Sequence, residues 1–208
     1  MILMKSGQLE SQQCRKELDE FNELLNSKPE LSETELLQFF KDRDQLVLLM
    51  GRVVGVDAPS MFNEELPILG KYRADFVVAD KNQKTFSFIE FEDAKLNSIF
   101  NQRVNKKTST YPWASRFEHG YSQVIDWYLH LAVNDKTSNM QSEFGQYSIK
   151  YNGALIIGRR DGLKLGDCQE RFDARVERLL VDSKHIACYT FDDLYEAMDD
   201  QFVILSQF

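Results

Sequence analysis

Two apolar runs separated by a short polar connection constrain the fold of this chain most strongly. Residues 74–79 and 85–92 are rich in Phe, Val and Ile, which favour the half-buried, pleated surface of a strand. The connection between them, residues 80–84, is polar and has the length of a hairpin loop. The pattern therefore predicts an antiparallel pair of strands.

Helices are predicted ahead of this pair. Leu and Phe recur at helical spacing over residues 10–25, and Ser32 with Glu35 has the capping-box pattern that begins a second helix. We expect residues 1–29 to form an N-terminal helical segment, of which the first nine residues are frayed. Residues 30–208 would then form the main domain.

The remaining segments alternate between strand and helix patterns. Residues 45–56 are rich in Leu and Val and could form a strand, although so short an apolar run separates strand from helix only weakly. A loop with Pro59 and Pro67 follows. Further helices are expected over 117–131 and 172–181 and from residue 192, with polar loops at 97–115 and 134–139 and further strands over 153–158 and 186–190. This order predicts an α/β domain with a mixed sheet and helices on its faces.

Composition limits the partners and the compartment. A net charge of -8 over 208 residues argues against a protein that coats nucleic acid by bulk attraction, but it is compatible with a local basic groove. No apolar run approaches the roughly 20 residues of a membrane span, so we expect a cytoplasmic protein without a membrane partner. The three cysteines are far apart and lack a C-x-x-C spacing, so they predict neither a disulfide framework nor a zinc site.

Two strand-end carboxylates are the first candidates for chemistry. Alternation along the strand places Glu90 and Glu92 on one face, where burial costs several kcal/mol unless the charge is paired or metal-bound. Asp75 opens the neighbouring strand, and in a hairpin the start of one strand lies beside the end of the next. Asp75 and Glu90 could together hold Mg²⁺ or Mn²⁺ for phosphodiester hydrolysis, or they could simply pair with Arg73 or Lys95.

Three segments of the chain resemble a known family. Residues 73–78, 88–95 and 115–127 are similar to the nuclease domain of the Shedu anti-phage proteins, and the resemblance covers roughly residues 30–195. That domain is similar in turn to the PD-(D/E)XK superfamily, whose pattern is an Asp, then (Asp/Glu)-x-Lys on the next strand, then a helix that often carries a Gln. The resemblance implies a restriction-endonuclease-like core, metal-dependent DNA endonuclease activity in anti-phage defence, and a homo-oligomer.

The resemblance also assigns roles to residues. Asp75 and Glu90 match the metal-binding acids, and Gln123 matches the helix glutamine. Glu92 stands where the superfamily has its lysine, which normally acts on the attacking water and the developing charge. Lys95 could take over that role, or Glu92 could be a third metal ligand. If neither does so, the chain is a nuclease-fold module that binds nucleic acid or assembles with partner proteins without cutting.

Basic residues near these acids are candidates for contacts with DNA. They cluster with aromatic residues before the third segment or flank the acidic pair, as is typical of a local phosphate-binding surface. His119 lies one turn before Gln123 on the expected helix. The candidates are Arg73, Arg103, Lys106, Lys107, Arg116 and His119.

Overall fold

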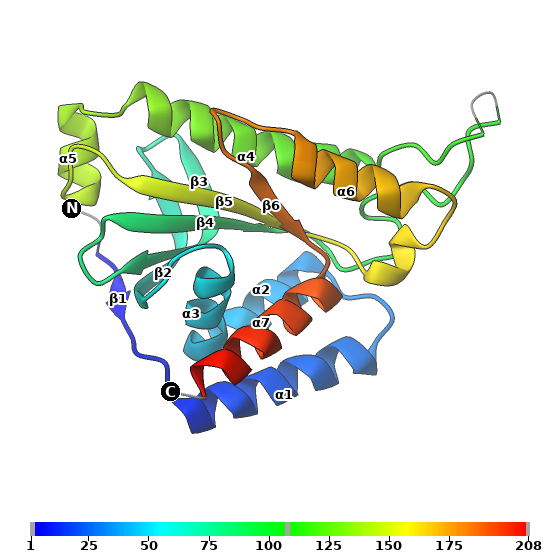
Figure 1. The fold of residues 1–208 in the computed structure, drawn as a ribbon, viewed down its shortest axis with the longest axis horizontal. Coiled ribbons are helices and arrows are strands. Elements are labelled where there is room, and N and C mark those ends of the chain that lie inside the picture. The colour runs from blue at the N-terminus through cyan, green and yellow to red at the C-terminus, as the bar shows by residue number, and fades with distance from the viewer. Residues whose placement is uncertain (1–2, 107–108, 207–208) are drawn as a thin grey trace.

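A computed structural model describes residues 3–106 and 109–206, which form a mixed sheet of six strands with helices on both faces (Figure 1). The strands are β1 (Lys5–Ser6), β2 (Pro59–Ile68), β3 (Tyr72–Asp80), β4 (Thr85–Phe91), β5 (Lys150–Ile156) and β6 (Ile186–Tyr189), and they lie in that order across the sheet. Neighbours from β1 to β4 are antiparallel, whereas β4, β5 and β6 are parallel.

The helices divide between the two faces. They are α1 (Ser11–Ser27), α2 (Glu33–Lys41), α3 (Asp44–Val53), α4 (Ser115–Val133), α5 (Ser138–Phe144), the short 3₁₀ helix η1 (Arg160–Leu163), α6 (Cys168–Arg178) and α7 (Phe191–Leu205). One apolar core lies between the sheet and α4 with α6, and the other lies between the sheet and α1, α2, α3 and α7 (Figure 1). The predicted α/β architecture is therefore confirmed.

The predicted hairpin is β3 and β4. Phe76 pairs with Ile89, and the register continues to Ala79 opposite Phe86. The polar connection closes through the Asp80 carboxylate, which accepts hydrogen bonds from the backbone N–H groups of residues 84 and 85 at 2.7 and 2.6 Å. Such side-chain bonds to a turn's own backbone explain why a polar loop of this length ends one strand and starts the next.

Most of the predicted helices and strands are present. The capping box at Ser32 and Glu35 is formed and begins α2. The helix predicted over 117–131 is α4, in which Trp127 is fully buried in the core. Among the helices of the described residues, none has the length and apolar character that a bilayer span requires.

Two predictions were wrong between residues 45 and 68. Residues 45–56 contain helix α3 and no strand. The sequence pattern was misleading because every residue from Gln45 to Gly51 is buried, and a helix covered on all sides has no periodic apolar pattern. The predicted loop with Pro59 and Pro67 is strand β2. Among the described residues its outer neighbour is the two-residue strand β1, so most of β2 is an edge where proline is tolerated.

Two shorter corrections concern the polar segments. Lys5 and Ser6 pair with β2, so the expected frayed start of the chain contains strand β1. Part of the expected polar loop after α4 is helix α5, where the Thr137 side chain accepts a hydrogen bond from the backbone N–H of Met140. Both segments are short and polar, and their structure comes from a neighbouring strand or from a cap and not from an apolar pattern.

Candidate functional site

Asp75 and Glu90 face each other where the ladder between β3 and β4 ends. The last paired residues are Phe76 and Ile89, so the same register places Asp75 opposite Glu90. Side chains opposite each other on one face of such a pair have Cβ atoms about 5 Å apart. Asp75 Oδ2 also accepts a hydrogen bond from the backbone N–H of Phe91 at 2.8 Å, which fixes the Asp75 carboxylate against β4. The hairpin therefore holds the two carboxylates side by side.

Glu90 is a buried acid with an oxygen that has no partner. It is 8 % exposed, and its Oε2 makes no hydrogen bond with any of the described residues. Burial, followed by the negative charges of Asp75 and Glu92, raises the pKa of Glu90 to about 10. Burial likewise raises the pKa of Asp75 to about 6. The pair thus occupies a largely buried site in which a proton or a cation must compensate the carboxylate charge.

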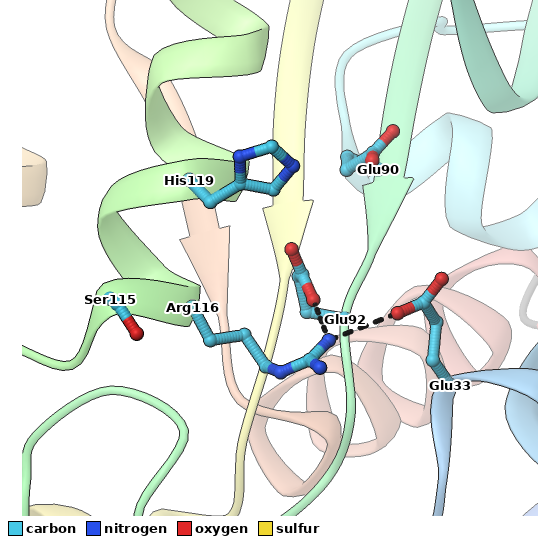
Figure 2. Close-up of a pocket in the computed structure, with 6 residues that line it drawn as sticks. All are labelled: Glu33, Glu90, Glu92, Ser115, Arg116 and His119. Carbon is cyan, nitrogen blue, oxygen red and sulfur yellow. Dashed lines mark hydrogen bonds and ion pairs between the residues drawn. The ribbon is translucent and has the colours of Figure 1, made fainter.

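Helix α4 covers this pair. Gln123 donates a side-chain hydrogen bond to Glu90, which opposes the rise in the pKa of Glu90. His119, one turn earlier, lines the same cavity as Glu90 (Figure 2). The helix comes this close because of Gly120, where an added Cβ would lie 2.7 Å from Leu155 Cδ1 and 3.2 Å from Glu92 Cγ. The hairpin and α4 therefore bring Asp75, Glu90 and Gln123 together.

An ion-pair network lies along the opposite side of the cavity (Figure 2). Arg116 Nη1 contacts the carboxylate of Glu92 and lies 3.0 Å from Glu33 Oε2, while its Nε lies 3.4 Å from Asp93 Oδ2. Burial raises the pKa of Glu92, and the pairing with Arg116 offsets only part of this rise. The cavity has a volume of about 580 Å³ and is lined by Glu33, Glu90, Glu92, Ser115, Arg116 and His119.

Comparison with known protein families identifies the family of this chain. The model of the family described as "Shedu protein SduA, C-terminal" matches residues 30–195. The chain belongs to this family. Membership of the Shedu family indicates a role in anti-phage defence. None of the curated proteins compared with the chain matches it.

The remaining candidate residues of this Shedu family member are paired with other carboxylates or exposed. Lys95 Nζ is 2.9 Å from Asp93 Oδ2 and is not among the six residues that line the cavity. Arg73 pairs with Glu65 at 3.0 Å. The segment between β4 and α4 projects from the body of the molecule (Figure 1). In this segment Arg103 and Lys106 are exposed, and Lys107 lies outside the described residues.

The donor set suits a hard divalent cation. Mg²⁺ takes oxygen ligands and is commonly held by one or two carboxylates, with water and substrate phosphate completing its coordination. Asp75 and Glu90 supply two carboxylates, and the Glu90 oxygen without a partner is available to a cation. Within residues 3–106 and 109–206, no group of three or more His, Cys, Asp and Glu side chains is placed to hold a metal ion by itself. The site thus fits a two-carboxylate metal and not a closed structural one.

Sequence reasoning missed Glu33 and Ser115, which line the cavity. Glu33 is the first residue of α2 and directly follows the capping Ser32. An acid in the first turn of a helix is commonly explained by the helix dipole, so its local pattern points to no site. Only the fold places it beside Arg116, because α2 and α4 lie on opposite faces of the sheet and meet at the end of β4.

Proposed function

We propose that this protein is a metal-dependent DNA endonuclease of anti-phage defence, built on a restriction-endonuclease-like core. The observation that carries the proposal is the pairing of Asp75 and Glu90 at one strand end, with the buried Glu90 oxygen left without a partner. Homo-oligomeric assembly and a cytoplasmic location, which the family resemblance and the composition led us to expect, belong to the same proposal.

Each side chain of the site has a separate role in this proposal. Asp75 and Glu90 would hold Mg²⁺ or Mn²⁺, which when bound lowers the pKa of an attacking water and neutralises charge on the phosphate. Gln123 orients Glu90 through its hydrogen bond. Arg116 supplies a positive charge in the same cavity as Glu90, and its guanidinium fork suits a phosphate oxygen pair.

Nicking of supercoiled plasmid tests this proposal. We expect Glu90→Ala to abolish nicking that depends on Mg²⁺ or Mn²⁺, because removal of one of two acids destroys the metal site. Glu64→Ala is the matched control, since Glu64 lies on neighbouring strand β2 and pairs with Lys5 at the surface at 2.7 Å. Both variants should keep the circular dichroism spectrum of the wild type. Equal nicking by wild type and Glu90→Ala would show that the activity does not come from this site.

A second candidate function is a nuclease-fold module that binds nucleic acid or partner proteins without cutting. It is favoured by the position of Lys95, which pairs with Asp93, and by the carboxylate at position 92. The substitution Glu92→Lys restores the superfamily pattern and separates the two functions. A wild type that is inactive with every metal tested, and that gains activity on Glu92→Lys, would identify the natural protein as a binding module.

A further inference from the structure

Arg116 joins the two helical layers of the molecule across the end of β4. It is the second residue of α4, which covers one face of the sheet, whereas Glu33 begins α2 on the other face. Figure 2 shows the guanidinium between Glu33 and Glu92 at the edge of the cavity. The ion pair between Arg116 and Glu33 therefore spans the same opening through which a substrate would reach Glu90.

The two carboxylates that share Arg116 Nη1 differ in their freedom to move. The Glu92 side chain is only 5 % exposed, so its position is fixed by packing. The Glu33 side chain is 43 % exposed and the Arg116 side chain 44 %, so their contact can open without disturbing the core. A half-exposed ion pair contributes little stability, and it is easily exchanged for another pair.

The charges around Arg116 indicate what can replace Glu33. A guanidinium presents its donors in a planar fork that matches carboxylate and phosphate oxygens equally well. Five carboxylates gather here, namely those of Glu33, Asp75, Glu90, Glu92 and Asp93, and Arg116 contacts three of them. Among the described residues that line the cavity, Arg116 is the one Lys or Arg side chain, so an incoming anion finds its guanidinium there, while the carboxylates beside it repel the anion.

We propose that Glu33 occupies, in the DNA-free protein, the place on Arg116 that a backbone phosphate of DNA takes in the complex. This inference rests on the proposed function, since it requires that the cavity binds nucleic acid. Arg116 keeps its contact with the buried Glu92 and exchanges Glu33 for the phosphate. Glu33 is thus a positioning residue that holds the guanidinium at the opening and competes with the substrate.

Competition predicts an unusual result, which is that loss of Glu33 tightens DNA binding. We expect Glu33→Gln to lower the Kd for a short fluorescent duplex about threefold, the size expected for release of one half-exposed ion pair. Arg116→Gln should weaken binding and lower the slope of log Kd against log salt concentration by about 0.9, the value for one lost phosphate contact. Binding is measured by fluorescence anisotropy of the full chain in EDTA, so that no cleavage occurs.

Glu118→Gln is the matched control for the charge removed. Glu118 is 44 % exposed, lies on α4 two residues after Arg116, and pairs with Arg175. Arg175 packs over the rings of Trp113, Phe117 and Tyr121 and is only 19 % exposed, so its release gives DNA no new contact. Glu118→Gln should therefore change the Kd much less than Glu33→Gln does.

A double-substitution cycle completes the test. The decrease in Kd caused by Glu33→Gln should disappear in the Arg116→Gln background, because Glu33 then has no guanidinium for which to compete with the phosphate. Equal gains from Glu33→Gln and Glu118→Gln, a gain that persists without Arg116, or no binding by any variant would overturn the inference. Nicking assays on the same proteins keep the two proposals separate. Tighter binding without cleavage would refute the nuclease alone, and cleavage without the Glu33 effect would refute the competition alone.

Discussion

The substitution Glu90→Gln should stabilise the metal-free protein at neutral pH. The folded state raises the pKa of Glu90 from 4.5 to about 10, so above pH 4.5 the folded chain keeps a proton that the unfolded chain releases. Stability is therefore lost as the pH rises from 4.5 towards 10. Between pH 4.5 and 7 this loss reaches about 3 kcal/mol, at about 1.4 kcal/mol per pH unit. Glutamine has nearly the same shape and does not titrate, so the variant avoids this loss.

Chemical denaturation in EDTA measures the effect as a difference in the free energy of unfolding. The free energy of unfolding of the variant should increase relative to that of the wild type as the pH rises. Mg²⁺ or Mn²⁺ should stabilise the wild type alone. Glu17→Gln is the control, because Glu17 is 4 % exposed but accepts hydrogen bonds from the backbone N–H groups of Gln45 and Leu46 at 3.0 and 3.1 Å. That substitution should destabilise the protein by about 2 kcal/mol. A difference between Glu90→Gln and wild type that does not change with pH would refute the reasoning.

Three further predictions concern other parts of the structure. Lys95→Ala should change the nicking rate much less than Glu92→Gln does, because Lys95 pairs with Asp93 whereas Glu92 lines the cavity with Glu90; a loss on the order of 10²-fold in a plasmid assay would instead place Lys95 at the reacting phosphate. Gly120→Ala should weaken metal-dependent stabilisation in thermal melts, since the new Cβ would lie 2.7 Å from Leu155 Cδ1 and 3.2 Å from Glu92 Cγ and would displace the groups packed between α4 and the sheet; an unchanged melt with metal would contradict this. Arg159→Ala should lower the free energy of unfolding in urea by roughly 3 kcal/mol, because it removes the partner of Asp192 and two bonds to backbone carbonyls; a loss below about 1 kcal/mol would show that this contact is a surface pair.

The centre of the candidate site could be predicted because it depends on local pattern. Strand alternation puts Glu90 on the face towards α4, and the length of the hairpin loop sets the register that brings Asp75 opposite it. Gln123 follows from the resemblance, and the helical pattern around it places it on the covering helix. These three positions require only the pairing of adjacent strands and one helix. They lie together in the structure, and their roles remain predictions.

The rim of the site could not be predicted, because it depends on contacts between distant segments. Glu33 and Arg116 are far apart in the sequence and come from opposite faces of the sheet. The misread helix α3 has the same origin, since the two-sided burial that hides its period is created by α1 and α7 on one side and the sheet on the other. Local pattern determines which face a side chain takes, but not which remote element covers it.

The residue at position 92 explains why this site needs two ligands to satisfy its charges. A lysine there would place a fixed cation beside Glu90, whereas Glu92 adds a negative charge that helps raise the pKa of Glu90. Arg116 returns one positive charge, but it is half exposed and shared with Glu33. A metal ion alone would replace the proton on Glu90 and leave Arg116 paired with Glu33. A phosphate alone would bind Arg116 next to carboxylates that repel it. Only a metal ion and a phosphate together satisfy both groups, so on our two proposals each should bind more tightly in the presence of the other.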